Sequence, residues 1–129
     1  MNGGGRPSGT VKPMNPEPTS VADLGPEEAS RLADAGALLL DVREDDEWEA
    51  GRAPGAVHVA MGQVAERIDE IPADRTVVCI CRVGGRSAAV ANALAGAGYD
   101  VRNVAGGMQA WAGLGLPVVD ESGDAGSVI

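Results

Sequence analysis

The fold of this chain is decided by the stretch Thr76-Val77-Val78-Cys79-Ile80-Cys81-Arg82-Val83-Gly84-Gly85-Arg86-Ser87. The stretch begins with a continuous apolar run, passes through two glycines between two arginines, and leads into an alanine-rich segment that extends to Ala95. This order predicts a strand, a tight loop and a helix. Because the strand shows no polar alternation, we expect it to be buried on both faces, as in a parallel sheet.

Cys81 is the candidate reactive residue, because ligands of open parallel sheets bind beyond the carboxyl ends of the strands. The pair Gly84-Gly85 allows backbone conformations that turn successive N–H groups toward an anion. The helix expected after the loop adds unsatisfied N–H groups and the positive end of its dipole. Arg82 and Arg86 add full positive charge. Together these features predict a cysteine with a lowered pKa, and a cradle for an anion carried by its sulfur.

Further strands and helices alternate along the rest of the chain. We expect strands over residues 20–24, 37–40, 56–60, 76–80 and 100–104, and helices over residues 26–35, 44–50, 63–71, 87–95 and 106–112. This alternation predicts an α/β domain with a mainly parallel sheet of about five strands and helices on both faces. In such a sheet Asp41 and Cys81, each following an apolar strand, lie at the same edge.

Composition limits the domain organisation and the partners. The chain has 129 residues, a net charge of −9 and 44% apolar residues. Residues 1–20 contain many glycines and prolines and no hydrophobic region for a secretory signal, so we expect a disordered tail. Residues 21–119 are the expected domain, and residues 120–129 an acidic C-terminal tail. The negative charge argues against nucleic acid and against anionic membranes as partners.

The cysteine count bears on redox compartment and metal binding. Residues 79 and 81 are the two cysteines. Alternate residues of a strand lie about 6.6 Å apart, near the upper limit for a disulfide, so we expect both thiols to be free. Free thiols suit a reducing compartment, and we therefore expect a cytoplasmic protein. One histidine and two close cysteines do not have zinc-site spacing, so no metal and no other cofactor is expected.

The loop Cys-x-x-Gly-x-Arg-Ser over residues 81–87 resembles the active-site loop of rhodanese-like sulfurtransferases. The resemblance continues upstream in Asp41-Val42-Arg43-Glu44 and in the Gly-Arg-Ala-Pro-Gly-Ala-Val-His-Val segment of residues 51–59. It continues downstream in residues 104–111 and 115–118, in the order and spacing of the family. It covers about residues 21–119 and implies the three-layer rhodanese-like fold of a single domain.

The resemblance also implies an activity and a set of site residues. Cys81 would take a sulfane sulfur from thiosulfate or a persulfide donor, become a persulfide, and pass the sulfur to a thiol or cyanide acceptor. The expected substrate-binding residues form the loop after it: Arg82, Val83, Gly84, Gly85, Arg86 and Ser87. We expect Arg82 to face the anionic substrate. Arg86 should pair with an acid such as Asp41 or Glu44.

Supporting roles are expected for Asp41 and Arg43, which should build the pocket wall by hydrogen bonds. His58, the single histidine, is expected to be structural, and Trp48 and Trp111 to be packing residues.

Two other function classes stay open from the sequence. The related Cdc25-type phosphatases and arsenate reductases share this architecture, but their loops place five residues between cysteine and arginine. Here four residues, 82–85, separate Cys81 from Arg86. A non-catalytic binding module or a sulfur carrier is the second alternative. The presence of Cys81 argues against the non-catalytic form and leaves the carrier open.

Overall fold

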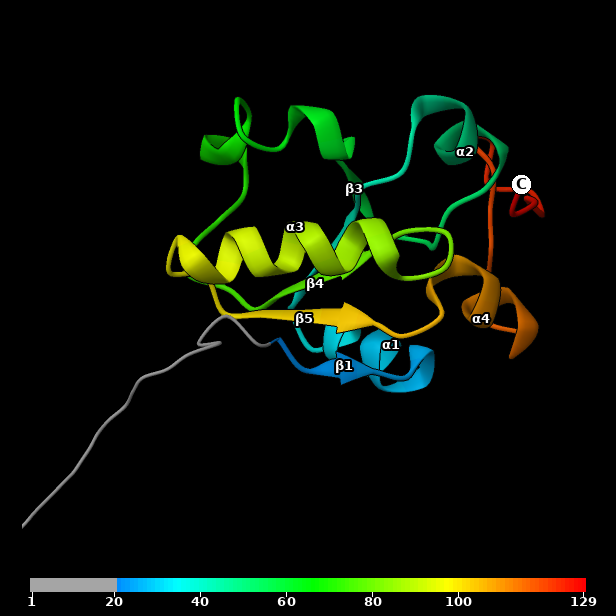
Figure 1. Cartoon of the computed structure of the whole chain (residues 1–129). Coiled ribbons are helices and arrows are strands. Elements are labelled where there is room, and N and C mark those ends of the chain that lie inside the picture. The colour runs from blue at the N-terminus through cyan, green and yellow to red at the C-terminus, as the bar shows by residue number, and fades with distance from the viewer. Residues whose placement is uncertain (1–20) are drawn as a thin grey trace, which may run out of the picture.

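The computed structural model describes residues 21–129, and the predicted tail of residues 1–20 lies outside them. Five strands form one sheet in the order β1-β5-β4-β2-β3, and every pairing between neighbours is parallel (Figure 1). The strands are β1 (Asp23–Leu24), β2 (Leu38–Asp41), β3 (Val57–His58), β4 (Val77–Ile80) and β5 (Val101–Val104). The predicted five-stranded parallel sheet is confirmed.

Helices cover both faces of the sheet, which confirms the three-layer α/β prediction (Figure 1). One face carries α3, and the other carries α1 and α4. The α-helices are α1 (Pro26–Asp34), α2 (Asp45–Ala50), α3 (Gly85–Gly96) and α4 (Gly107–Gly113).

The central strand β4 explains how the layers are joined. All four of its residues are fully buried, and their side chains alternate between the two faces. Val77 and Cys79 join the cluster under α3, whereas Val78 and Ile80 join the cluster under α1 and α4. Each such aliphatic side chain contributes about 1.5–3 kcal/mol when it leaves water. The absence of polar alternation in this stretch therefore reflects a strand with a core on each side.

The segment 63–71 differs from the single helix expected there. In its place the structure has two short 3₁₀ helices over residues 61–70, η1 (Met61–Gln63) and η2 (Ile68–Glu70), separated by turns. The Tyr99 hydroxyl reaches the carbonyl oxygens of Ile68 (3.3 Å) and Ile71 (2.8 Å). A side chain from a distant part of the chain thus binds two carbonyl oxygens at the C-terminal end of this segment. The local apolar spacing correctly marks Val64 and Ile71 as buried, but tertiary contacts favour the tighter turns.

Residues 117–129, which we name the C-terminal strap, return along α2. Val119 forms an antiparallel bridge with Arg52. The Ser127 N–H donates to the Ala50 carbonyl oxygen (2.8 Å), and Val128 packs against the apolar cluster under α1 and α4. The strap therefore holds the C-terminal end of α2 against the domain. Among residues 21–129, no helix combines the length and apolar character needed to cross a membrane.

Candidate active site

Cys81 lies where β4 ends, and the loop after it leads within four residues into α3. Its side chain is fully buried. Strands β2 and β4 are parallel neighbours, and Asp41 pairs in register with Ile80. Asp41 and Cys81 therefore reach the same edge of the sheet, as the parallel order predicts.

Two hydrogen-bond donors point at the sulfur of Cys81. The Gly84 N–H lies 3.1 Å from Sγ, and the Ser87 hydroxyl lies 3.3 Å from it. Gly84 has φ +110°, a left-handed conformation that glycine adopts without steric cost, and this conformation aims its N–H inward. The loop is thus a small nest of donors around one sulfur atom.

The donors decide the acidity of the thiol. Burial acts to raise the pKa of Cys81, but hydrogen bonds oppose it, first from the Ser87 hydroxyl and then from the N–H groups of Ser87, Gly84 and Val83. The result is a pKa below the ordinary value of a cysteine. Cys79 has the opposite environment: burial, and secondarily the charge of Cys81, raise the pKa of its thiol to about 12. Both cysteines are free, and Cys81 is the one suited to ionise.

Arg86 pairs with Glu47, not with Asp41 or Glu44 as expected. Its Nη1 and Nη2 lie 2.7 Å and 2.9 Å from the two carboxylate oxygens of Glu47, in a bidentate pair. The Arg86 hydrogen bonds, helped by the Glu44 N–H, lower the pKa of Glu47 to about 2. The expectation was wrong because Asp41 is occupied by Arg43, and Glu44 lies exposed just before α2. The pair ties α2 to the start of α3 beside the loop.

Asp41 and Arg43 form a buried pair at the edge of the sheet. The Arg43 guanidinium donates to both oxygens of Asp41 and to the Gly51 carbonyl oxygen (2.7 Å). Within residues 21–129, neither side chain makes a hydrogen bond to the loop of residues 81–87. They fix the backbone between β2 and α2, and so the position from which Glu47 reaches Arg86.

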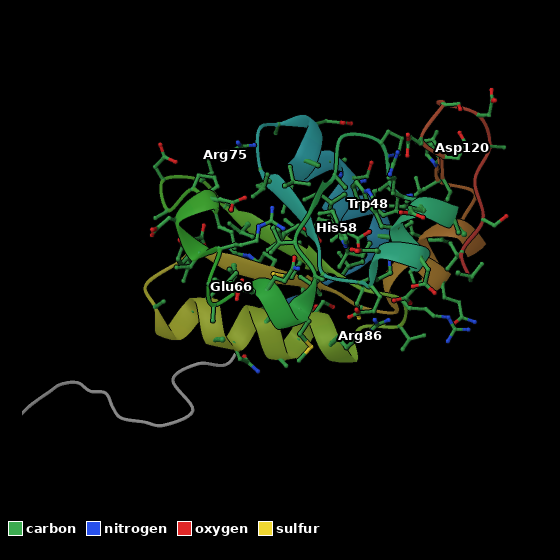
Figure 2. All side chains as sticks on the ribbon, turned by 90° about the horizontal axis from the view of Figure 1, so that it is seen from above. Trp48, His58, Glu66, Arg75, Arg86 and Asp120 are labelled. Carbon is green, nitrogen blue, oxygen red and sulfur yellow. The ribbon has the colours of Figure 1, made fainter. Side chains whose placement is uncertain are left out.

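Trp48, a residue of α2, lies next to His58, as Figure 2 shows. Their rings stack with centroids 4.8 Å apart, and the Arg52 guanidinium lies 4.6 Å from the Trp48 ring centroid. His58 Nε2 also hydrogen-bonds the Arg43 carbonyl oxygen at 2.7 Å. These contacts agree with packing roles for the two rings. Trp111 is buried and donates its Nε1–H to the Pro117 carbonyl oxygen.

Comparison with known proteins identifies the family. The model of the rhodanese-like domain matches residues 25–114. The chain belongs to the rhodanese-like domain family. A protein named sulfurtransferase from Allochromatium vinosum is 42% identical over 97 residues, which are 74% of this chain and 91% of that protein. The thiosulfate sulfurtransferase GlpE of Pseudomonas syringae is 35% identical over 94 residues, which are 72% of this chain and 89% of that protein.

The rhodanese-like fold is also found in solved structures similar to this one. A rhodanese-related protein from Thermoplasma volcanium superposes with a TM-score of 0.74 at 29% identity. The match covers 78% of this chain and 99% of that chain. The similarity thus extends over most of the described domain.

In this rhodanese-like domain the start of α4 supports the loop of residues 81–87, a contact that the sequence did not lead us to expect. The N–H groups of Met108 and Gln109 donate to the carbonyl oxygens of Cys81 (2.7 Å) and Arg82 (2.9 Å). The approach is close because Gly107 has no side chain: a Cβ there would overlap the Cys81 carbonyl oxygen. The paired glycines before α4 were the available signal, since such pairs mark close backbone approach. Asn103 adds a third support, donating to the Gly84 carbonyl oxygen at 3.3 Å.

The remaining predicted site residues line the outside of the loop. Arg82 and Val83 are exposed, and Val83 has 54% of its surface open to solvent. Gly85 is the first residue of α3. No group of three potential metal-ligating side chains occurs in the described part of the chain.

Proposed function

We propose that this domain transfers a sulfane sulfur from thiosulfate or a persulfide donor to a thiophilic acceptor through a Cys81 persulfide. The observation that carries the proposal is the pair of donors 3.1 Å and 3.3 Å from Sγ, in a loop whose backbone is held from behind by α4. Such donors favour a thiolate over a thiol, and they remain available to a charged sulfur added to it. The sulfurtransferase names of two relatives support the same reaction class.

The reaction follows as two displacements at sulfur. The Cys81 thiolate attacks the outer sulfur of thiosulfate, a new S–S bond forms, and sulfite leaves with the electron pair of the broken bond. The Cys81 persulfide then presents its outer sulfur to an acceptor. With cyanide as acceptor, thiocyanate leaves and the thiolate returns; with a thiolate acceptor, a new persulfide leaves.

The residues of the loop have different proposed roles. Gly84 and Ser87 donate to the sulfur, and we propose that they hold the negative charge of the thiolate and of the persulfide. Arg82 is exposed at the rim and would attract an anionic donor. Arg86 is committed to Glu47 and would keep the loop in shape. Two free thiols also lead us to propose a reducing compartment, such as the cytoplasm.

Intact mass measurement after incubation with thiosulfate tests the proposal. The wild-type protein should gain one sulfur atom, which cyanide or dithiothreitol should remove. Cys81→Ser should gain none and should lose thiosulfate:cyanide activity. Cys79→Ser is the matched control and should keep both, because its thiol lies inside the strand with a raised pKa. A sulfur adduct that persists in Cys81→Ser would refute the assignment.

Two further assays separate the alternatives. A phosphatase would hydrolyse p-nitrophenyl phosphate in a Cys81-dependent way, faster than it transfers sulfur. We expect negligible hydrolysis, because a tetrahedral oxyanion needs more donors than four intervening residues supply. A sulfur carrier would form the adduct only with a partner protein as donor, and would not turn over with thiosulfate and cyanide alone.

A further inference from the structure

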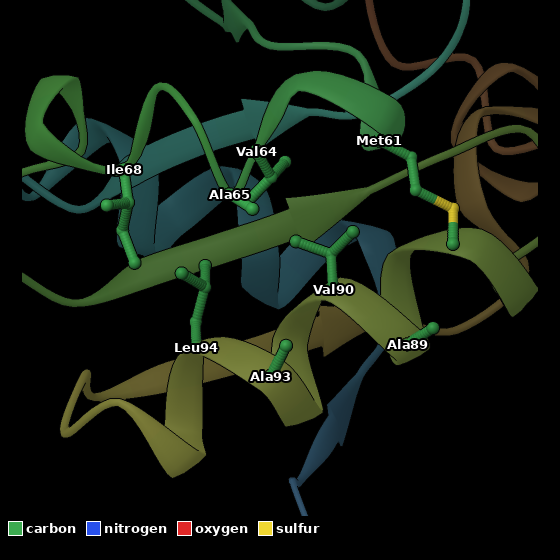
Figure 3. Close-up of a pocket in the computed structure, with 8 residues that line it drawn as sticks. All are labelled: Met61, Val64, Ala65, Ile68, Ala89, Val90, Ala93 and Leu94. Atoms are coloured by element: carbon green, nitrogen blue, oxygen red, sulfur yellow. The ribbon is translucent and has the colours of Figure 1, made fainter.

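An apolar groove lies outside the site described above, between α3 and the segment that carries η1 and η2 (Figure 3). Its volume is about 280 Å³. Its lining contains no charged or polar side chain and consists of Met61, Val64, Ala65, Ile68, Ala89, Val90, Ala93 and Leu94. Met61 is exposed, with 40% of its surface open to solvent. An open groove with this lining is suited to an apolar group.

The groove and the loop of residues 81–87 share helix α3. Residues 86, 89, 90 and 93 recur at helical spacing, so the face of α3 that lines the groove begins at Arg86. The next residue, Ser87, donates to the Cys81 sulfur. Figure 3 shows the Met61 side chain reaching over the part of α3 that carries Ala89. Ala89, at the Met61 end of the groove, follows Ser87 by two residues of α3, a rise of about 3 Å along the helix axis.

The loop offers apolar surface as well as the charge of Arg82. The bidentate pair with Glu47 already satisfies Arg86, so its charge is largely neutralised. Helix α2, which carries Glu47, also begins with Asp45 and Asp46, both exposed. At the loop itself, the exposed apolar side chain of Val83 stands next to Arg82. Beside the charge of Arg82, an organic group therefore finds apolar surface at Val83 and in the groove.

We propose that the groove binds the alkyl or aryl group of an organic sulfane donor, a thiosulfonate or persulfide, and holds it while its terminal sulfur passes to Cys81. This inference rests on the proposed function. With an arenethiosulfonate the Cys81 thiolate takes the terminal sulfur, the sulfur–sulfur bond breaks, and the arenesulfinate leaves with the electron pair. A cavity of about 150 Å³ with a similar lining holds benzene, so the groove has room for a phenyl ring.

Steady-state kinetics with benzenethiosulfonate and thiosulfate test the groove. The quantity compared is the ratio of kcat/KM for the two donors, with cyanide as acceptor. Ala93→Trp places an indole in the groove and should lower this ratio about tenfold, through the KM for benzenethiosulfonate. Asn92→Trp is the matched control: it adds the same side chain one residue earlier, at an exposed position outside the groove, and should leave the ratio unchanged. Equal ratios in wild type and Ala93→Trp would overturn the proposal.

A binding measurement separates failure of this inference from failure of the proposed function. Methyl NMR spectra of Cys81→Ser are recorded during titration with benzenesulfinate, which needs no sulfur chemistry. Binding in the groove should shift the methyl signals of Met61, Ala89 and Ala93, and Ala93→Trp should abolish the shifts. Absence of shifts overturns the groove proposal even if sulfur transfer is active. A variant without residues 1–20 is compared in the absence of ligand. If this deletion moves the same methyl signals, the groove is assigned to that segment and the proposal is overturned.

Discussion

Replacing Glu47 by Gln isolates the contribution of the ion pair that joins α2 to the reactive loop. Gln keeps the size of the side chain and the oxygen that accepts the Glu44 N–H, and it removes the charge that faces Arg86. The pKa of Glu47 falls from an ordinary 4.5 to about 2. At 1.36 kcal/mol per pKa unit this corresponds to about 3 kcal/mol. Because 34% of the Arg86 side chain is exposed, solvent weakens the pair. We therefore expect Glu47→Gln to lower the unfolding free energy by about 2 kcal/mol.

The lowered pKa of Glu47 also predicts how the loss of unfolding free energy in Glu47→Gln depends on pH. A carboxylate whose pKa is lowered by folding stabilises the protein fully above its unfolded pKa, near 4.5 for Glu47. That contribution is lost as the pH falls through the folded value of about 2. The difference in unfolding free energy between wild type and Glu47→Gln should therefore be complete at neutral pH and shrink steadily in acid.

Urea unfolding followed by tryptophan fluorescence, at neutral pH and near pH 3, measures this difference. Glu49→Gln is the control, since it removes the same charge from an exposed position of α2. It should change the unfolding free energy by less than about 0.5 kcal/mol. A Glu47→Gln variant as stable as wild type at neutral pH, or a deficit that does not change in acid, would refute the reasoning.

Three further changes test other parts of the site. The alkylation rate of Cys81 by iodoacetamide should reach its plateau at a lower pH than for a free thiol, and Ser87→Ala should move that pH upward; an unchanged profile would exclude the hydroxyl as a donor. Gly107→Ala should lower the unfolding free energy by about 2 kcal/mol and reduce sulfur transfer, measured by urea unfolding and thiocyanate formation, because a Cβ there overlaps the Cys81 carbonyl oxygen. Deleting residues 120–129 should lower the unfolding free energy in urea by about 1–2 kcal/mol, because the hydrogen bonds from Ser127 to Ala50 and from Gly126 to Val118 are lost; full stability of the truncated chain would contradict the role given to the strap.

The sequence by itself determined the fold class and the place of the reactive loop. The apolar run of residues 76–80 has no polar alternation, and a strand of that kind is stable only with a core on both faces. The glycines and Ser87 that follow specify a turn into a helix, so a donor cradle around Cys81 could be predicted from local chemistry alone. These inferences depend only on residues that are close together in the sequence.

The structure alone decided which distant residues meet. Five acids lie between residues 44 and 49, and no local rule selects Glu47 from them as the partner of Arg86. The choice depends on how the buried pair of Asp41 and Arg43 sets the start of α2. In the same way, two 3₁₀ helices stand where a single helix was expected over residues 63–71, and the hydroxyl of the distant Tyr99 contacts the carbonyl oxygens of Ile68 and Ile71.

The same limit applies to the start of α4, the strap and the groove. Gly107 is visible in the sequence as half of a glycine pair, yet its contact with the Cys81 carbonyl exists only because β4 and β5 are neighbours in the sheet. The strap reaches α2 through backbone groups, which every residue carries, so side-chain chemistry gives no sign of it. The groove is formed where η1 and η2 replace a regular helix against α3. Local pattern therefore determined the strands, the loop and the candidate cysteine, whereas packing between distant segments determined the supports of the loop and the surface beside it.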